Sequence, residues 1–158
     1  MYKSAKRGWY KLVNPSKFIP PTDKHMRSFN ESTQEVEYKS RLELRAMKYA
    51  DFNKHVLKFS VEPFPIKYIK PLDGKYHRYY IDMYLEFSDG SKFLVEVKSK
   101  GEAKEPDKPK RKTQKSINRY QIALQTYSVN IAKWSAAEEF CKQNGMKFII
   151  LTEKELGL

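Results

Sequence analysis

Two alternating segments joined by a short turn constrain this chain more than any other feature of its sequence. In residues 80–87 and again in residues 93–98, apolar side chains recur at every second position. Successive side chains of a strand point to opposite faces, so each segment offers one face that a core can bury. The turn between them, Ser88-Asp89-Gly90-Ser91, contains Asp-Gly, a strong hairpin signal. The two segments are therefore predicted to pair as antiparallel strands.

The apolar faces of the two segments match in one register. Its predicted cross-strand pairs are Ile81 with Val97, Asp82 with Glu96, Met83 with Val95, and Leu85 with Phe93. A slip of one residue would separate the two acids and bury the wrong face. This register requires a loop of odd length or a bulge, because a two-residue Asp89-Gly90 loop would give the wrong parity.

The predicted pairing brings two carboxylates and one ammonium group to the same face. Asp82 and Glu96 would lie opposite each other, with Lys98 beside Glu96. Magnesium prefers carboxylate oxygens and retained waters, and the backbone carbonyl of Val97 could complete the ligand set. The lysine could orient or help deprotonate a water, or stabilise a transition state. An ordinary solvent-facing charge cluster would show the same spacing, so the pattern alone is a weak signal.

Two further acids could belong to the same site. A helix is predicted from Ser40 to about Phe52, and Glu43 could supply a carboxylate from it, directly or through water. The alternative for Glu43 is a capping box, because Ser40-Arg41-Leu42-Glu43 fits the Ser-x-x-Glu pattern. Glu62 ends a strand predicted at about 56–62 and either lies near the site or faces solvent.

The positive charge of the chain is localised. Residues 1–30 hold seven Lys or Arg and one acid, residues 98–119 hold nine and three, and the rest holds fifteen of each. The whole net charge of +12 therefore lies in two segments. Such an excess indicates a polyanion partner, and the alternative is a pair of solvated flexible tails.

Length and composition predict one domain with an accessory arm. The expected division is an extended basic arm over residues 1–30 and a single domain over residues 31–158, with a mobile basic loop at 99–112. The arm is expected to have little regular structure and either to wrap the domain or to become ordered on a partner. The lone Cys141 excludes an intramolecular disulfide, and no run of about 18 apolar residues occurs. We therefore expect a soluble protein of a reducing compartment, with no membrane partner.

The remaining pattern predicts an α/β fold with a mixed sheet. Its expected elements are an initial helical turn within 31–39, an edge strand at about 66–70, helices at about 113–127 and 130–144, and a buried central strand at 146–151. Asn130 is a candidate N-cap for the last helix, and Gly145 is a candidate C′ residue.

These motifs resemble the PD-(D/E)XK nuclease superfamily. The resemblance rests on Glu43 in SRLELRAMKY, Asp82 in HRYYIDMYLEF and Glu96-Val97-Lys98 in LVEVKSK. Most of the chain also resembles the head-completion nucleases of T-even-type tailed phages, which are similar to the nuclease subunit of Tn7-type transposases. The matching stretches are NPSKFI, SRLE, VEPFPIKYIKPLDGKYHRYYID and KWSAAEEFCKQNGMKFIILTEKELG. Isoleucine, not proline, precedes Asp82, which leaves metal binding intact.

The resemblance implies a fold, a cofactor and a site. The fold is a restriction-endonuclease-like core with a mixed, largely antiparallel sheet flanked by helices, plus the basic arm. The implied catalytic residues are Glu43, Asp82, Glu96 and Lys98, and the implied metal ligands are Asp82, Glu96, Val97 and Glu43. The expected cofactor is Mg²⁺, with Mn²⁺ as a substitute.

Double-stranded DNA is the expected substrate. The candidate DNA-binding residues are His77, Arg78, Lys100, Lys110, Arg111, Lys112, Lys115 and Arg119. Such residues contact phosphates and read no sequence, so any selectivity would come from ends, branches or single-strand junctions, and binding should fall steeply with salt. For His77, a half-buried structural histidine is an equal alternative.

Two functions of different classes remain open at this point. One is an Mg²⁺-dependent endonuclease with little sequence specificity that acts when DNA-filled phage heads are completed, in the head or neck of the virion or in the host cytoplasm. The other is a non-catalytic head-completion protein that binds DNA and, through its arm, head, portal or neck proteins. The complete set of Asp82, Glu96 and Lys98 favours the nuclease. A junction resolvase would share the site but normally requires a dimer, and the sequence does not predict the oligomeric state.

Overall fold

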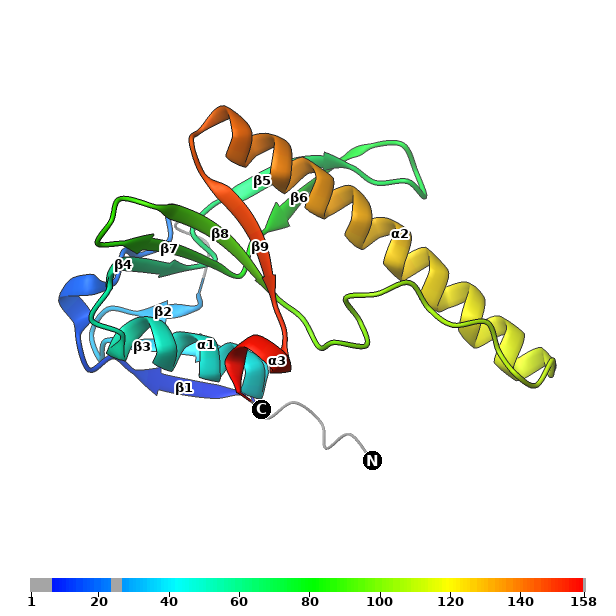
Figure 1. Cartoon of the computed structure of the whole chain (residues 1–158), viewed down its shortest axis with the longest axis horizontal. Coiled ribbons are helices and arrows are strands. Elements are labelled where there is room, and N and C mark those ends of the chain that lie inside the picture. Colours follow the sequence, from blue (N-terminus) through cyan, green and yellow to red (C-terminus); the bar gives the residue numbers. More distant parts are fainter. Residues whose placement is uncertain (1–6, 24–26, 158) are drawn as a thin grey trace.

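A computed structural model describes residues 7–23 and 27–157 (Figure 1). Its strands are β1 (Gly8–Lys11), β2 (Phe29–Asn30), β3 (Glu35–Tyr38), β4 (Val56–Val61), β5 (Pro65–Ile69), β6 (Tyr76–Tyr80), β7 (Met83–Phe87), β8 (Lys92–Val97) and β9 (Lys147–Leu151). The helices are α1 (Arg41–Phe52), α2 (Gln114–Gln143) and α3 (Glu153–Leu156), with a 3-10 turn at Pro15–Lys17.

The strands form three sheets. The central sheet has the order β4-β7-β8-β9, in which only β8 and β9 run parallel. The smaller sheets have the order β1-β3-β2 and the pairing β5-β6, and both are antiparallel. The predicted α/β fold class, with a mixed and largely antiparallel sheet flanked by helices, is confirmed.

Each face of the central sheet covers its own hydrophobic core. One core contains Met83, Leu85, Val95 and Val97 and packs against α1 and the β1-β3-β2 sheet. The other contains Leu94 and Trp134 and packs against α2 and the β5-β6 hairpin. Figure 1 shows α1 and the N-terminal strands on one side of the sheet, with α2 and the hairpin on the other. Side chains two apart on β8 therefore enter the same core, as period-2 alternation requires.

The predicted register between the two alternating segments is confirmed where β7 and β8 pair. Met83 lies opposite Val95 and Leu85 opposite Phe93. The Phe87 N–H donates to the Ser91 carbonyl at 2.9 Å, which leaves a three-residue loop whose Gly90 has φ +88°. The loop is therefore odd in length, as the alternation demanded, and its last residue has the backbone conformation that favours glycine.

The segment leading into this hairpin is not one strand. It divides at Asp82, so that β6 pairs with β5 and only β7 enters the central sheet. As a result, the predicted pairs Ile81 with Val97 and Asp82 with Glu96 lie outside the strand ladder. Ile81 is fully buried in the second core with Tyr79 and Leu94, because the bend turns it away from Met83.

Four other predictions of local structure are wrong. Residues 35–38 form strand β3 instead of a helical turn, and Val36 on that strand is fully buried. The two expected helices are the single helix α2, in which Asn130 is a buried internal residue and not an N-cap. Strand β9 lies at the edge of the central sheet and is half-buried, not central. The described part of the arm, expected to have little regular structure, contributes β1 and β2 to a sheet, although it does pack against the domain as one of the two alternatives had it.

Other local predictions hold. Ser40 caps α1, which ends at Phe52, and the β5 strand pairs only with β6 within the described residues. Gly145 follows α2 with φ +67°, the conformation expected of a C′ glycine.

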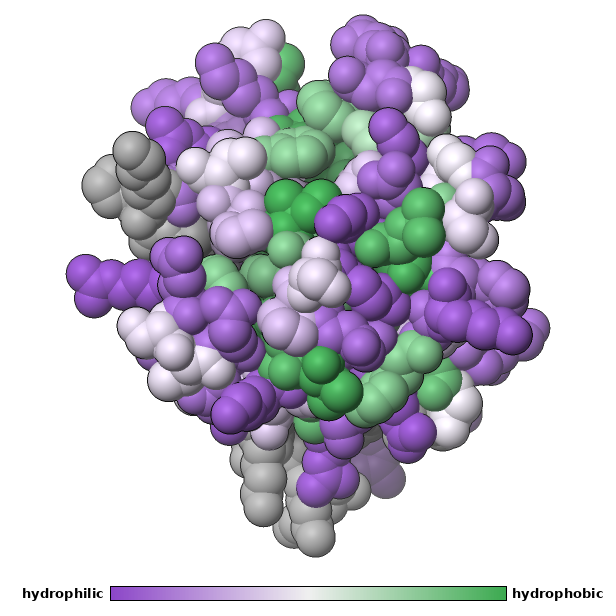
Figure 2. All heavy atoms as spheres, turned by 90° about the vertical axis from the view of Figure 1, so that its left-hand side faces the viewer, coloured by the Kyte–Doolittle hydropathy of each residue, from purple (hydrophilic) through white to green (hydrophobic). Residues whose placement is uncertain are grey.

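The surface of the described chain is mainly hydrophilic on the face seen in Figure 2, where hydrophobic side chains form small separate patches. Within residues 7–23 and 27–157, no helix has the length and apolar character needed to cross a membrane.

A buried carboxylate attaches the N-terminal segment to α1. Asp51 is fully buried and accepts hydrogen bonds from the Tyr10 hydroxyl at 2.6 Å and from the backbone N–H groups of Val13 and Asn14 at 2.8 and 2.9 Å. The Lys17 ammonium donates to three carbonyl groups at the C-terminus of α1. A cation at this end of a helix also complements the helix dipole. The segment that follows β1 is therefore fixed to the domain by polar contacts.

We predict that Asp51→Ala lowers the free energy of unfolding by about 2–4 kcal/mol, because it leaves several donors without an acceptor. Tyr10→Phe is the matched control, because it removes one donor and keeps the carboxylate, and it should cost about 1 kcal/mol. Urea unfolding of the two variants tests this. A decrease no larger for Asp51→Ala than for Tyr10→Phe would show that the carboxylate is not the anchor.

Candidate active site

The structure places Asp82 and Glu96 at the junction between the β5-β6 hairpin and the central sheet. Asp82 occupies the bend between β6 and β7, and Glu96 lies near the end of β8. The Val97 N–H donates to Asp82 Oδ2 at 2.7 Å, a contact that ties the bend to β8 outside the strand ladder. Glu96 is only 6% exposed. The two acids are thus neighbours, although by a side-chain contact and not by the cross-strand pairing that the sequence predicted.

Each carboxylate oxygen of Glu96 has its own partner. The Tyr79 hydroxyl donates a short hydrogen bond to Glu96 Oε2. The Lys98 ammonium lies 3.8 Å from Glu96 Oε1 and 3.9 Å from a carboxylate oxygen of Glu102. Tyr79 therefore fixes one oxygen of Glu96, while the partly exposed Lys98 lies beside the other.

Burial makes this a costly place for negative charge. Burial and the Glu96 charge raise the pKa of Asp82 well above its usual value, and the Val97 N–H opposes that shift. Burial also raises the pKa of Glu96, opposed by hydrogen bonds from Tyr79 and from the Asp82 carboxyl and by the charge of Lys98. The Glu96 charge thus disfavours ionisation of Asp82, and a bound cation would offset that repulsion.

The donor set fits a hard divalent cation. Two carboxylates and the backbone carbonyl of Val97 are oxygen ligands, and magnesium usually keeps several waters in its remaining positions. Within the described ranges, no group of three or more His, Cys, Asp or Glu side chains is arranged as a metal site. In the predicted ligand set, Asp82 and Glu96 would supply carboxylate oxygens and Val97 its backbone carbonyl, with Glu43 as a further carboxylate.

Glu43 has the capping contact and is also near the acids. The Ser40 hydroxyl accepts from the Glu43 N–H at 3.1 Å, and Glu43 Oε2 accepts from the Lys39 N–H at 2.8 Å. The second bond reaches one residue beyond the usual capping-box partner. Burial raises the pKa of Glu43, and the nearby Glu96 charge adds to the effect. The helix start therefore brings a third carboxylate toward Asp82, whose pKa Glu43 also raises.

Glu62 lies beside the site, where the sequence had left it undecided. Its N–H donates to the Asp82 carbonyl at 2.9 Å, and its side chain pairs with Lys39 at 2.7 Å. The backbone of Glu62 has φ +48°, which is uncommon for a residue with a side chain. One of its carboxylate oxygens is buried without a hydrogen-bond partner. The Glu62 backbone thus helps to hold the bend that presents Asp82.

Sequence reasoning missed two residues at this site. Tyr79 is the hydrogen-bond donor to Glu96, and Lys133 of α2 lies 5.6 Å from the centre of the Tyr79 ring. Burial lowers the pKa of Lys133, while the charge of Glu96 opposes that shift. The position of Tyr79, three residues before Asp82, was a signal that could have identified it as a residue of the site. Nothing in the sequence indicated Lys133, because the helix predicted at about 130–144 includes it but local sequence does not specify how that helix passes the site.

The predicted DNA-binding residues lie on several segments around the candidate site. Arg78 is exposed on β6, whereas His77 is half-buried and contacts Asp73 at 2.7 Å, as in its structural alternative. The others are exposed or half-exposed, on the segment that follows β8 or on the first part of α2; they are Lys100, Lys110, Arg111, Lys112, Lys115 and Arg119. Figure 1 shows this part of α2 extending away from the central sheet. No buried residue precedes Asn130 on α2, so this part is open to a partner.

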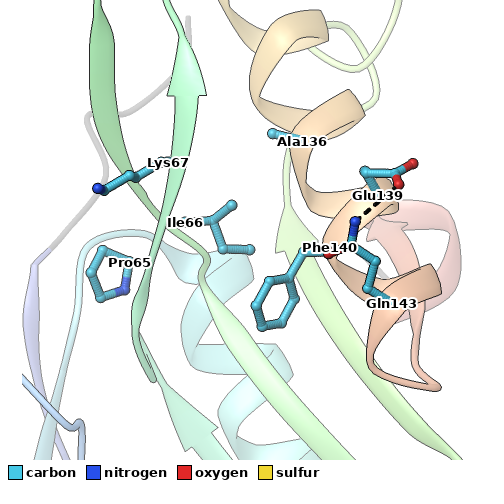
Figure 3. A pocket seen from close by; sticks show the side chains of 7 residues that line it. All are labelled: Pro65, Ile66, Lys67, Ala136, Glu139, Phe140 and Gln143. Atoms are coloured by element: carbon cyan, nitrogen blue, oxygen red, sulfur yellow. Dashed lines mark hydrogen bonds between the residues drawn. The ribbon is translucent and has the colours of Figure 1, made fainter.

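A separate groove lies between β5 and the C-terminal half of α2 (Figure 3). Its lining residues are Pro65, Ile66, Lys67, Ala136, Glu139, Phe140 and Gln143. None of the predicted catalytic or metal-binding residues lines this groove, so it is not part of the candidate site.

Comparison with known proteins decides the family. Residues 53–153 match the family described as TnsA-like endonuclease N terminal. The chain belongs to this endonuclease family. Over 145 residues this endonuclease is 31% identical to the head completion nuclease of Enterobacteria phage T4, a match that covers 92% of the chain and 95% of the phage protein. The resemblance noted in the sequence is confirmed. The family match includes Asp82, Glu96, Lys98 and Lys133, and it begins after Glu43.

The two interpretations of Glu43 can be separated by a matched pair of substitutions. Ser40→Ala removes the cap and should lower the free energy of unfolding by about 1 kcal/mol while leaving DNA cleavage unchanged. Glu43→Gln keeps an acceptor for the Lys39 N–H but removes the negative charge, so it should lower the cleavage rate at least tenfold with little change in stability. Urea unfolding and cleavage assays on both variants test this. Normal cleavage by Glu43→Gln would leave capping as the only role of Glu43.

Proposed function

We propose that this endonuclease is an Mg²⁺-dependent DNA endonuclease that acts in phage head completion with little sequence specificity. The observation that carries the proposal is the contact of the Asp82 bend with β8, which puts two buried carboxylates beside the Lys98 ammonium. The name of the phage T4 relative supports the biological context. Mn²⁺ is expected to replace Mg²⁺, because it accepts the same oxygen ligands.

Each residue of the site has a role in phosphodiester hydrolysis. Asp82, Glu96 and the Val97 carbonyl would hold the cation, with Glu43 contributing directly or through water. When bound, Mg²⁺ supplies charge neutralisation at the phosphate and a more acidic water. Lys98 faces the open side of Glu96 and is placed to orient the attacking water or to stabilise charge on the phosphate. Tyr79 restricts Glu96 to one orientation, and Lys133 adds positive charge behind it.

The basic residues support DNA as the substrate and argue against sequence reading. Lysines and arginines of the 99–112 segment and the first part of α2 form an exposed basic region next to the site. Contacts from such a region to phosphates position DNA without distinguishing bases. No element near the site, among those described, has the features of a base-reading helix in a groove.

The N-terminal arm supports a second proposal, docking to phage head, portal or neck proteins. Tyr10 and Phe18 of the arm contact this protein's own core. Trp9 is 48% exposed, and Val13 and Ile19 are also exposed. Exposed apolar side chains such as these can contribute to a docking surface for another protein. The non-catalytic head-completion role would rest on this surface and on the basic region alone, in the virion or during assembly in the host cytoplasm.

Cleavage of linear, nicked and branched DNA in Mg²⁺ separates the two functions. Asp82→Ala and Lys98→Ala should each lower the cleavage rate at least about 100-fold, because Asp82 would hold the cation and Lys98 would act at the reacting phosphate. DNA binding in Ca²⁺ should change less than fivefold. Lys92→Ala is the matched control, since Lys92 is an exposed lysine at the opposite end of β8.

Two results would count against the catalytic assignment. Asp82→Ala and Lys98→Ala could both cut as well as the parent, which would show that the wrong residues had been chosen. Alternatively, the parent could cut none of the three DNA forms in Mg²⁺ or Mn²⁺ while still binding them. That result would favour the non-catalytic role.

A further inference from the structure

The β5-β6 hairpin has two different faces. Its strand register alternates pairs that point inward with pairs that point outward. The inward pairs are Ile66 with Tyr79 and Tyr68 with His77. Ile66, Tyr68 and Tyr79 belong to the core that packs against α2, and the Lys133 ammonium lies over the rings of Tyr68 and Tyr79. The outward pairs are Lys67 with Arg78 and Ile69 with Tyr76. The outer face therefore carries a cationic pair near its middle and an apolar pair toward its tip.

Large apolar side chains are exposed at the tip of the hairpin. Tyr76 is 72% exposed, Leu72 in the connecting turn 57%, and Ile69 52%. Figure 1 shows the hairpin extending to a free end beside α2. Nothing in the described chain covers these three side chains. Exposed apolar residues gathered at a projecting tip indicate a surface for a partner.

Positive charge surrounds the apolar tip. Residues 65–80 contain Lys67, Lys70, Lys75 and Arg78 and a single acid, Asp73. Asp73 accepts from His77 and from the Lys75 N–H. Among residues 7–23 and 27–157, none of these four cations forms an ion pair. Like charges directly opposite each other destabilise a hairpin. An anionic partner would offset the repulsion between Lys67 and Arg78.

A partner of one class fits both features. An aromatic ring and two aliphatic side chains provide a surface on which a base can stack, and flanking cations contact phosphates. Inside an intact duplex the base faces are covered by neighbouring base pairs. They become available at a duplex end, a branch or a single-strand junction.

The hairpin connects this tip to the candidate active site. Tyr79, three residues from Tyr76 on the same strand, donates to Glu96. At about 3.3 Å per residue, the two tyrosines are roughly 10 Å apart along the strand, about three nucleotides of a stacked chain. Because Tyr76 lies on the outward face and Tyr79 on the inward face, DNA held at the tip would pass the edge of the hairpin to reach Glu96 and Lys98.

We propose that the tip of the β5-β6 hairpin recognises DNA structure. Tyr76, Leu72 and Ile69 stack on the exposed base face of an end or junction, and Lys67 and Arg78 contact the adjoining phosphates. This inference rests on the proposed endonuclease function, and it names the element that selects where the enzyme cuts. Cleavage is then expected within a few nucleotides of the junction.

Competition binding without cleavage tests the proposal. A forked oligonucleotide competes against a covalently closed circular duplex for the protein in Ca²⁺. The parent should prefer the fork at least tenfold. Tyr76→Ala should reduce that preference at least fivefold, and Tyr76→Trp should retain it because the indole also stacks. Tyr49→Ala is the control, because Tyr49 is an exposed tyrosine on α1 away from the hairpin.

The cations of the hairpin should behave differently from the ring. Lys67→Ala and Arg78→Ala should weaken binding to both DNA forms, and each should lower the salt slope by about one, because each removes a cation that neutralises a phosphate. Tyr76→Ala should leave that slope unchanged. Unchanged fork preference in Tyr76→Ala, or an equal decrease in affinity for both DNA forms, would overturn the proposal and leave the apolar tip to a protein partner.

The same assay separates this inference from the proposed function. Binding in Ca²⁺ requires no hydrolysis, so a protein that never cuts DNA still reports its structural preference. Fork preference that depends on Tyr76 without any Mg²⁺-dependent cleavage would contradict the endonuclease proposal alone. Cleavage that depends on Asp82 but is insensitive to Tyr76 would contradict the hairpin proposal alone.

Discussion

The hydrogen bond from the Val97 N–H to Asp82 is the interaction on which the site depends. It forms where the chain leaves the β5-β6 hairpin and enters the central sheet, so one bend both ends a strand and presents a carboxylate. It holds the Asp82 side chain against β8, while the Glu62 N–H holds the Asp82 carbonyl. The bond also holds Asp82 in a buried setting where the charge of Glu96 raises its cost of ionisation. A protein that evolved only for stability would not be expected to keep that arrangement.

The rest of the fold supports this bend from two sides. On one side, the core beneath Met83 and Val95 fixes β7 against β8, and α1 brings Glu43 toward the acids. On the other, Tyr79 of the hairpin donates to Glu96, and Lys133 of α2 lies over the Tyr79 ring. Because both sheets meet at Asp82, the same hairpin that carries the exposed tip also carries a residue of the site. Strand β6 therefore connects the hairpin tip, which is proposed to recognise DNA, with the site that contains Asp82 and Glu96.

The features that the sequence predicted correctly are those that follow from the period-2 alternation of apolar side chains. The pairing of Met83 with Val95 and the odd loop followed from which faces must be buried, and so did the meeting of Asp82 and Glu96 in outline. The bend at Asp82 was not predictable in this way, because residues 76–87 contain no glycine or proline and alternate without interruption. Asn130 suggested a helix boundary by its capping preference, but tertiary packing buried it within α2. Lys133 depends on how α2 crosses the sheet, which local sequence does not specify.

The central claim, that Asp82 and Glu96 share one cation, is tested most directly by the dependence of stability on Mg²⁺. Urea unfolding of the parent should show added stability in Mg²⁺, about 2.7 kcal/mol when the free ion is at 100 times its dissociation constant. Asp82→Asn, which keeps an acceptor for the Val97 N–H, should lose that increment and be at least as stable as the parent without metal. Equal stabilisation of the parent and Asp82→Asn by Mg²⁺, or none for the parent, would contradict the account.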